Sequence, residues 1–548
     1  MKQNKIYKIF YLSLLICNSV AGYAQSTSFL ADGADDFIRR SQLLGKVSIQ
    51  LSLTNRSFIS NYQMMDSLLP WKKISVIKTK SSLNIQYLPL TITGQVNSHH
   101  AYGWNDAGMI PASGLQTLVS GGIYASVGHF SIQIKPEMVY AENPDFETFP
   151  HEHYDVFWQH YYQWLNKSDI PEKFGDGVYK KILSGQSSIR FNSGAISFGV
   201  STESLWWGPG TRNALVMSNN APGFLHATIN SIKPIQTKIG SFEGQIIGGK
   251  LSSSGILPPD RNRYNANNQL LYIPKHEESR YIAGMVFSWQ PKWVKGLFIG
   301  FTKASYLYQS NISGIADILP LEGIIQSKTE SNGQKASLGS LFVRYVMPEE
   351  NAELYLELGR SDKSPSLINL ATDIGYPRAY VAGFNKLFAT KGSAYIQFSS
   401  EFTQMQLPTA ELIQTASSWY THPYVRQGYT NEGQVLGAGI GPGSNSQMID
   451  ISWVKGFSKL GLLFERVVHN NDFYYNAFVV TNDATRHWID LSTTCHVDWK
   501  FNKFLLSSRM ALIRSLNYQW YVFPDLGYYN NGYDVLNFHA NFSISYRL

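Results

Sequence analysis

The residues most suggestive of metal chemistry are three histidines in one aromatic stretch. His151, His153 and His160 lie in "HEHYDVFWQH". A zinc-protease helix would need His-Glu-x-x-His, so that both imidazoles reach one metal from one helix face, and that spacing is missing here. We therefore interpret the histidines as polar residues of an aromatic loop, and we predict neither a metal nor a cofactor.

A second candidate is the glycine-rich "GAGIGPG", residues 437–443. A dinucleotide loop reads Gly-x-Gly-x-x-Gly and opens a helix whose N-terminus holds the phosphates. The residues that follow, "SNSQMIDISWV", read as a strand, so we predict a glycine-rich turn or strand bend. The sequence contains no Gly-x-Ser-x-Gly, and we predict no enzymatic activity. Because catalytic triads are defined by geometry, a membrane-embedded hydrolase stays an alternative.

The most distinctive stretch is "ESLWWGPGTRNALVMSNNAPGF", residues 203–224. An indole can stack on the apolar face of a sugar, while arginine and asparagine donate hydrogen bonds to hydroxyl or acidic groups. The candidate ligand-binding residues are Trp206, Trp207, Arg212, Asn219 and Asn220. The alternative is structural, because tryptophan pairs are common at membrane interfaces and Gly-Pro-Gly is a rigid turn. We expect the two indoles to have the structural role of stabilising the barrel. We expect the other three side chains to face the barrel lumen.

The N-terminus indicates secretion. Lys2, Lys5 and Lys8 precede a short apolar run, and "GYAQ" offers a small-x-small cleavage site after Ala24. We therefore predict a signal peptide over residues 1–24 and a mature domain over 25–548. A lipoprotein would use Cys17, but Ile16 stands where a small residue is needed.

The mature chain carries little charge and no disulfide framework. Removing the three lysines lowers the formal charge from +7 to about +4, too little to indicate a nucleic-acid partner. Of two cysteines only Cys495 remains after cleavage. Stability must then come from packing or from a closed sheet.

Composition narrows the fold class. Charged residues are 16% and aromatic residues 14%, and 44 glycines are present. Soluble domains carry about 25% charged residues. The mature sequence has no apolar run long enough for a transmembrane helix. This combination favours a transmembrane antiparallel β-barrel over a large soluble all-β protein.

Strand patterns support the barrel. In "VLNFHANFSISYRL", residues 535–548, apolar and polar residues alternate strictly from Leu536 to the final Leu548. The same alternation recurs over residues 130–140. Residues 343–347 and 352–358, joined by "PEEN", read as a hairpin. About 16 to 18 such segments are present, with boundaries uncertain by a few residues.

Three regions interrupt the alternation. Residues 29–47 have helical spacing, with acidic residues before Arg39 and Arg40, and predict a helical plug segment at the periplasmic mouth. Residues 149–183 predict a partly helical loop insertion. Residues 257–280 are polar and predict a long loop, which in such barrels is extracellular.

At residues 203–224 the sequence resembles the Wzi family of capsule-assembly outer-membrane proteins, in the branch found in Bacteroidetes-type bacteria. The resemblance rests on the WWGPG core and the following Ser-Asn-Asn. It is supported by "RRSQLLGKV", by residues 105–143 and by residues 427–445, so it spans most of the mature chain.

The resemblance implies a barrel of about 18 strands, closed by loops and a small N-terminal helical segment, in the cell outer membrane. It implies a non-enzymatic role: binding or organising capsular or extracellular polysaccharide at the cell surface. The implied partners are surface polysaccharide and outer-membrane lipid, and the implied state is a monomer. The alternative is an outer-membrane porin or solute channel. A TonB-dependent transporter does not fit, because about 520 residues hardly hold a plug and a 22-stranded barrel.

Overall fold

The computed structural model describes most of the mature chain. The described residues are 33–55, 77–78, 83–258, 260–320, 334–361, 378–407, 417–478, 486–521 and 533–547. The predicted signal peptide and the terminal Leu548 lie outside them.

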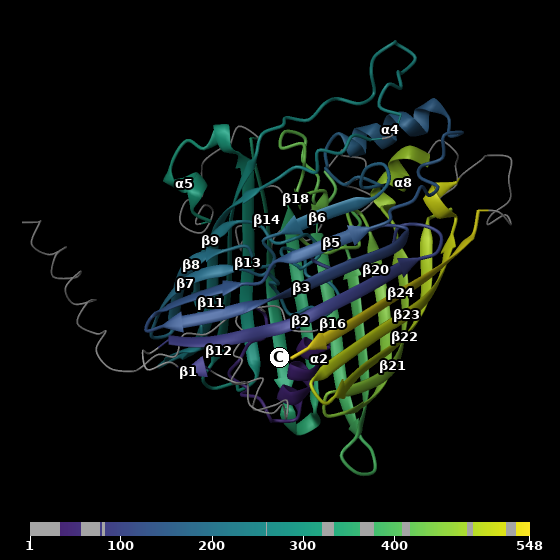
Figure 1. Ribbon diagram of the computed structural model, residues 1–548. Helices are drawn as coiled ribbons and strands as arrows, with labels where there is room; N and C mark the ends of the chain where they lie inside the picture. Colours follow the sequence, from purple (N-terminus) through teal and green to yellow (C-terminus); the bar gives the residue numbers. More distant parts are fainter. Residues whose placement is uncertain are drawn as a thin grey trace, which may run out of the picture.

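The chain forms a closed antiparallel β-barrel with 18 strand positions around the wall, as predicted (Figure 1). We call each position a stave, whether it holds one strand or two short ones. Three staves each consist of two strands: β4 with β5, β6 with β7, and β9 with β10. The last strand pairs with β2, from Leu90 opposite Tyr546 to Asn97 opposite His539, so the sheet has no free edge there. The strands in chain order are β1 (Ile77–Lys78), β2 (Leu83–Asn97), β3 (Gly114–Val127), β4 (Phe130–Ile134), β5 (Glu137–Ala141), β6 (Tyr179–Leu183), β7 (Ser188–Ser193), β8 (Ile196–Ser201), β9 (His226–Ser231), β10 (Ile235–Thr237), β11 (Gly240–Leu251), β12 (Arg280–Pro291), β13 (Leu297–Tyr308), β14 (Lys335–Met347), β15 (Ala352–Ser361), β16 (Arg378–Ala389), β17 (Tyr395–Gln404), β18 (Thr430–Asn431), β19 (Gln434–Val435), β20 (Asn445–Lys455), β21 (Ser458–Val468), β22 (Ile489–Phe501), β23 (Phe504–Leu516) and β24 (Val535–Tyr546).

The wall is apolar outside and polar inside, the reverse of a soluble sheet. On β15, Leu354 and Leu356 are 49% and 40% exposed, whereas Glu353 and Glu357 are 0% exposed. Such an outward apolar face suits lipid, and the inward face suits a polar interior. The predicted hairpin is confirmed, because β14 and β15 pair through the turn at Pro348–Glu350.

The two ends of the barrel differ. Short turns join the strands at one end, and long segments join them at the other. Helices α4 (Asp155–Leu165), α5 (Ile315–Ile318) and α8 (Asn471–Phe478) lie at the long-loop end, and α2 (Ala34–Leu43) lies inside the short-turn end (Figure 1). No described helix is long and apolar enough to cross a membrane.

Helix α2 falls within the predicted plug segment, and α4 within the predicted loop insertion, whose last residues form β6. Helix α2 is fixed to the wall by ion pairs. Arg39 Nε lies 2.9 Å from Glu353 Oε1, and Arg344 Nε donates to the other oxygen of Glu353 at 2.7 Å. A second ion pair joins α2 to β21, where Lys459 lies 3.6 Å from Asp36.

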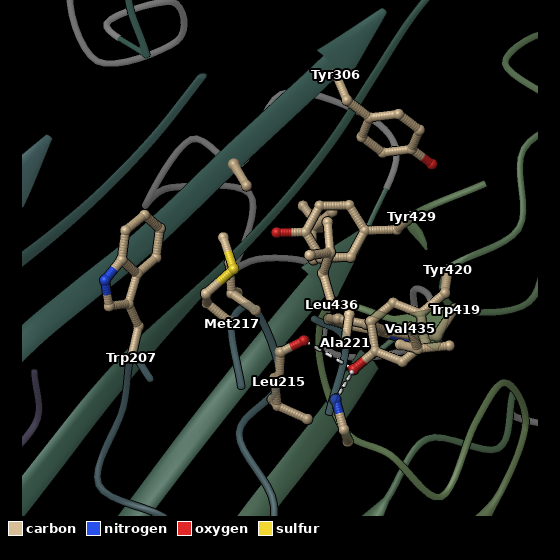
Figure 2. Close-up of a cluster of buried hydrophobic side chains, with 14 of the residues drawn as sticks. Trp207, Leu215, Met217, Ala221, Tyr306, Trp419, Tyr420, Tyr429, Val435 and Leu436 are labelled. Atoms are coloured by element: carbon tan, nitrogen blue, oxygen red, sulfur yellow. Dashed lines mark hydrogen bonds between the residues drawn. The ribbon is translucent and has the colours of Figure 1, made fainter. Parts of the chain in front are cut away.

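The lumen is filled by chain rather than left open. Segments 33–55, 98–113, 202–225 and 417–444 fold inward, and their side chains pack with inward-facing wall residues. Figure 2 shows part of this core, in which Trp207, Trp419 and Tyr429 pack with residues of the chain between Leu215 and Ala221. The Tyr420 hydroxyl donates to the Leu215 carbonyl at 2.7 Å and accepts from the Ala438 amide at 2.9 Å. These contacts join segments 202–225 and 417–444.

Candidate functional site

The Gly-Pro-Gly turn of residues 208–210 lies against carboxylates of the barrel wall. Gly208 has φ +114°, and a Cβ there would lie 2.7 Å from an oxygen of Glu357. A Cβ on Gly210 would lie 1.9 Å from the Asn213 carbonyl. Both positions therefore require glycine. The turn that results directs the amides of Thr211 and Asn213 at Glu401, at 2.6 and 2.8 Å.

The two tryptophans are buried in the lumen. Trp206 is 1% exposed and Trp207 is 0% exposed. Trp207 Nε1 donates to Gln245 Oε1 on β11 at 3.0 Å, and its backbone bridges to Asn55 and to Met217. Trp207 thereby ties the N-terminal segment to segment 202–225, and neither indole presents a face to solvent.

The three polar candidates lie at the centre of the lumenal packing. Arg212 makes two hydrogen bonds to Glu465, at 2.9 and 2.7 Å, and its guanidinium lies 4.6 Å from the ring centre of Trp104. Burial opposes its charge, but Glu465, together with Tyr102 and Asp106, raises the pKa of Arg212. Asn219 donates to the Asn105 carbonyl, and Asn220 to the Val435 carbonyl. Arg212 and Asn219 are half-buried, and Asn220 is buried.

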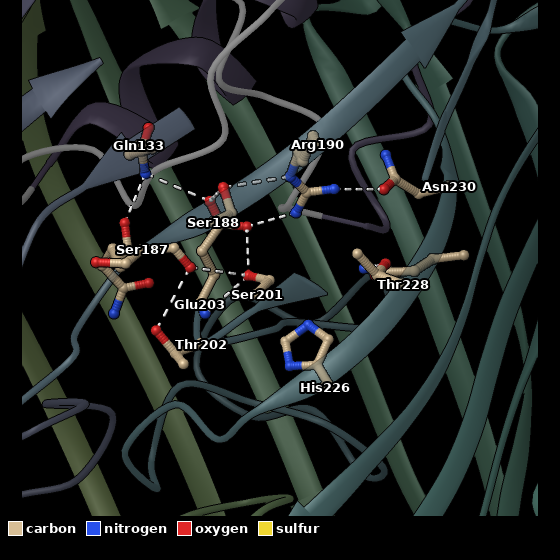
Figure 3. A network of polar contacts seen from close by, with 12 residues as sticks. Gln133, Ser187, Ser188, Arg190, Ser201, Thr202, Glu203, His226, Thr228 and Asn230 are labelled. Atoms are coloured by element: carbon tan, nitrogen blue, oxygen red, sulfur yellow. Dashed lines mark hydrogen bonds and ion pairs between the residues drawn. The ribbon is translucent and has the colours of Figure 1, made fainter. Parts of the chain in front are cut away.

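Glu203, the first residue of the 203–224 stretch, is hydrogen-bonded into a second polar network on the wall. Figure 3 shows Arg190 of β7 between Glu203 and Asn230, with hydrogen bonds of 2.6 and 2.7 Å. Ser188 and Ser201 also donate to the Glu203 carboxylate. All these groups are buried, and their mutual pairing positions the chain where it leaves β8.

The glycine-rich 437–443 segment crosses the motif inside the lumen and leads directly into β20, as the strand pattern predicted. The Gly437 carbonyl accepts from the Ser218 hydroxyl at 2.5 Å. A Cβ on Gly439 would lie 2.5 Å from both Asn220 Oδ1 and Trp104 Cβ. The glycines therefore permit close packing of two lumenal segments.

A cavity of about 1120 Å³ opens at the long-loop end. It lies between the loop that contains α4 and the loop that precedes β12, and two loops meeting around a concave space are a usual setting for a ligand. Its lining mixes acidic, basic, amide and aromatic side chains. These include Phe146, Tyr161, Asp169, Glu172, Asp176, Arg261, Asn262, Arg263 and Lys275.

Two carboxylates of the lining, the buried Asp169 and the half-buried Glu172, hold this cavity in shape. Asp169 accepts from the Ser254 amide and hydroxyl, at 2.7 and 2.6 Å, which joins the two loops. Glu172 accepts from the Tyr161 hydroxyl and the Phe149 amide, and burial raises the pKa of Glu172. These contacts preorganise part of the cavity lining before any ligand arrives.

Other lining groups carry hydrogen-bond donors. Arg261 and Asn262 are exposed, and their side chains have no hydrogen-bond or ion-pair partner among the described residues. Lys275 lies 5.8 Å from the ring centre of Tyr272, and burial lowers the pKa of Lys275 to about 8. Arg263, by contrast, is engaged by Asp155 at 2.9 Å. Three donors and the half-buried ring of Phe146 thus remain for a hydroxyl-rich ligand.

The three histidines are separated by the fold. His151 is exposed and contacts Asp260 at 2.7 Å. His153 packs among the rings of Phe149 and Phe157, and burial lowers its pKa to about 4. His160 lies on the outer face of α4. Within the described ranges, no group of three or more His, Cys, Asp and Glu side chains is placed to hold a metal.

The sequence did not single out this cavity. Residues 149–183 and 257–280 were interpreted as a loop insertion and a long loop, but nothing in their spacing showed that they face each other. The available signal was indirect: each range combines aromatic residues with basic and amide residues, as in "DRNRYNANNQ".

The exposed apolar wall, the polar interior and the asymmetric ends define a transmembrane β-barrel of the outer-membrane type with a filled lumen. A sequence model of the family described as capsule assembly protein Wzi matches residues 91–511. The chain therefore belongs to the Wzi family of capsule assembly proteins, and it is an outer-membrane protein. A comparison with curated protein sequences finds no match.

One solved structure agrees on the fold, and two others are less similar. Wzi of Escherichia coli, described as an outer-membrane protein involved in group 1 capsule assembly and a carbohydrate-binding β-barrel, is 10% identical with a TM-score of 0.56. The alignment covers 96% of this chain and 100% of that one. OpdQ of Pseudomonas aeruginosa and OccAB4 of Acinetobacter baumannii are each 8% identical, with TM-scores of 0.39 and 0.40. Each alignment covers 84% of this chain and 97% of the other.

Proposed function

We propose that the chain binds surface polysaccharide in the cavity at its long-loop end and thereby holds the polymer at the cell surface. Long loops of outer-membrane barrels are extracellular, so the cavity faces the medium. The observation that carries the proposal is its lining, in which preorganised carboxylates accompany the free donors of Arg261, Asn262 and Lys275. Carbohydrate binding described for the Escherichia coli protein supports the ligand class.

The role we propose is non-enzymatic. Two carboxylates of the cavity lining already have protein partners: Asp169 joins two loops, and Glu172 accepts hydrogen bonds within its own loop. Binding needs no reaction, since hydrogen bonds to several hydroxyl groups and ring contacts retain a polymer. Repeated weak contacts along one chain give a high total affinity.

We also propose a monomer embedded in outer-membrane lipid. Closure of β24 onto β2 leaves no unpaired strand edge at that junction to recruit a second copy. Outward leucine and phenylalanine side chains of the wall supply the surface for acyl chains.

The test is binding of the host's own surface polysaccharide to the purified, folded barrel. Replacing Arg261 and Asn262 together with alanine removes two donors, and we expect about a tenfold loss of affinity, since hydrogen bonds to charged groups are worth about 1.5–3 kcal/mol. Affinity is measured by isothermal titration or a glycan pull-down.

The matched control is Lys250→Ala, which removes an exposed cation from β11 outside the cavity lining. It should leave affinity unchanged. Equal binding by the wild type and the Arg261/Asn262 double variant would reject the cavity as the glycan site. A heat-modifiable gel shift verifies that each variant is folded.

A further inference from the structure

A second cavity, of about 860 Å³, lies at the short-turn end, between the plug and the barrel wall. Its size is within the range of ligand pockets. Short turns of outer-membrane barrels are periplasmic, so this cavity faces the opposite compartment from the glycan cavity proposed above. We refer to it as the periplasmic pocket.

Hydrogen bonds fix the shape of the periplasmic pocket. Gln42, at the end of α2, donates to the carbonyls of Ser48 and Leu51, at 3.0 and 2.7 Å. Gln290 on the wall donates to the Ile49 carbonyl at 2.8 Å. Gln236 of β10 donates to the Gln50 side chain at 3.3 Å. The chain after α2 is therefore pinned to the wall, and the pocket is a built feature rather than a gap between loose segments.

The charged side chains that line the pocket are all positive. Lys46 follows α2, and Lys292 and Lys295 lie in the turn between β12 and β13; all three are exposed lining residues. Among the described residues, none of the three ammonium groups has an ion pair or hydrogen bond, and no lining residue carries a carboxylate. Three unpaired cations in a concave, polar site attract an anion.

The remaining lining indicates the kind of anion. Glutamine, serine and threonine side chains supply neutral donors and acceptors, as hydroxyl groups of a sugar require. Protein partners are usually anchored by Trp, Tyr or Arg, and none of these is among the described lining residues. The chemistry thus favours a ligand with both carboxylates and many hydroxyl groups.

We propose that the periplasmic pocket binds a carboxylated glycan, with Lys46, Lys292 and Lys295 pairing its carboxylates. Two sources have this chemistry: a uronate-containing extracellular polysaccharide on its way to the surface, and the peptide-bearing glycan of the cell wall. The proposal extends the glycan-binding function proposed above to a second site with a defined ligand charge.

The test uses the full chain, purified and folded, with three labelled probes: an oligogalacturonate, a neutral galactan oligomer of the same length and a muropeptide. In Lys46→Gln/Lys292→Gln/Lys295→Gln, affinity for at least one carboxylated probe should fall at least tenfold. Binding by the wild type should weaken with added salt, because salt screens the charges. The carboxylated probe whose affinity falls identifies the source.

Two controls separate this site from other effects. Lys391→Gln/Lys455→Gln removes exposed cations from other periplasmic turns, outside the lining, and should change nothing. The Arg261/Asn262 alanine variant should keep the lysine-dependent binding, so failure here is distinguishable from failure of the extracellular site. Equal affinity of the wild type and the triple lysine variant for both carboxylated probes would overturn the proposal, as would equal binding of the neutral oligomer. The lysines would then serve, with the exposed Trp293, to position the barrel at the membrane–water interface.

Discussion

At the scale of single residues, substitution of Trp207 tests whether its indole stabilises the lumenal packing or contacts a sugar. Its indole is fully buried and donates to Gln245. Trp207→Ala should lower the stability of the packed lumen by about 3–5 kcal/mol, as other buried tryptophan truncations do. The change is measured by thermal unfolding and by proteolysis within residues 202–225. Retained stability together with lost glycan binding would instead assign the indole to the ligand.

Lys275 gives glycan binding a defined pH dependence. Burial lowers its pKa to about 8, so the ammonium is charged below this pH and neutral above it. Because the charged form is the stronger donor, affinity should fall about threefold or more between pH 7 and pH 9. Lys275→Arg stays charged over that range and should remove the dependence. Identical pH profiles for the two proteins would contradict a contact between Lys275 and the glycan.

At the scale of elements, the wall was predictable and the lumen was not. Alternation along β15 determines which face is apolar, because neighbouring side chains point in opposite directions. The partners of Trp207 are Asn55, Met217 and Gln245, which are distant from one another in sequence, and no local pattern encodes that meeting. Tryptophan, arginine and asparagine in residues 203–224 indicated special chemistry without revealing that their partners are protein groups.

Helix α2 should determine whether the barrel conducts ions. Arg39 bonds both Glu353 and the Pro209 carbonyl, so it joins the plug to the wall and to the Gly-Pro-Gly turn. In a planar bilayer the wild type should be nearly silent. Arg39→Ala should show intermittent opening, since losing such contacts weakens the plug by about 1–3 kcal/mol. Lys391→Ala, in a distant turn, is the control. Large steady conductance by the wild type would favour a porin.

At the scale of the whole molecule, the barrel separates the two cavities that we propose to bind glycans. The filled lumen leaves a preorganised cavity at the extracellular end and a cationic pocket at the periplasmic end. The fold class was accessible from composition and alternation, because both follow from the lipid environment. Neither cavity could be predicted from composition or alternation, since each is formed by segments that only the closed barrel brings together.

The most direct test of the central claim is surface retention of polysaccharide in living cells. Deleting the gene should release polymer into the medium while synthesis continues. Complementation with the wild-type gene should restore retention, whereas a folded Arg261→Ala/Asn262→Ala/Lys275→Ala variant at equal abundance should not. Unchanged retention in the deletion strain, or full rescue by the triple variant, would contradict the account.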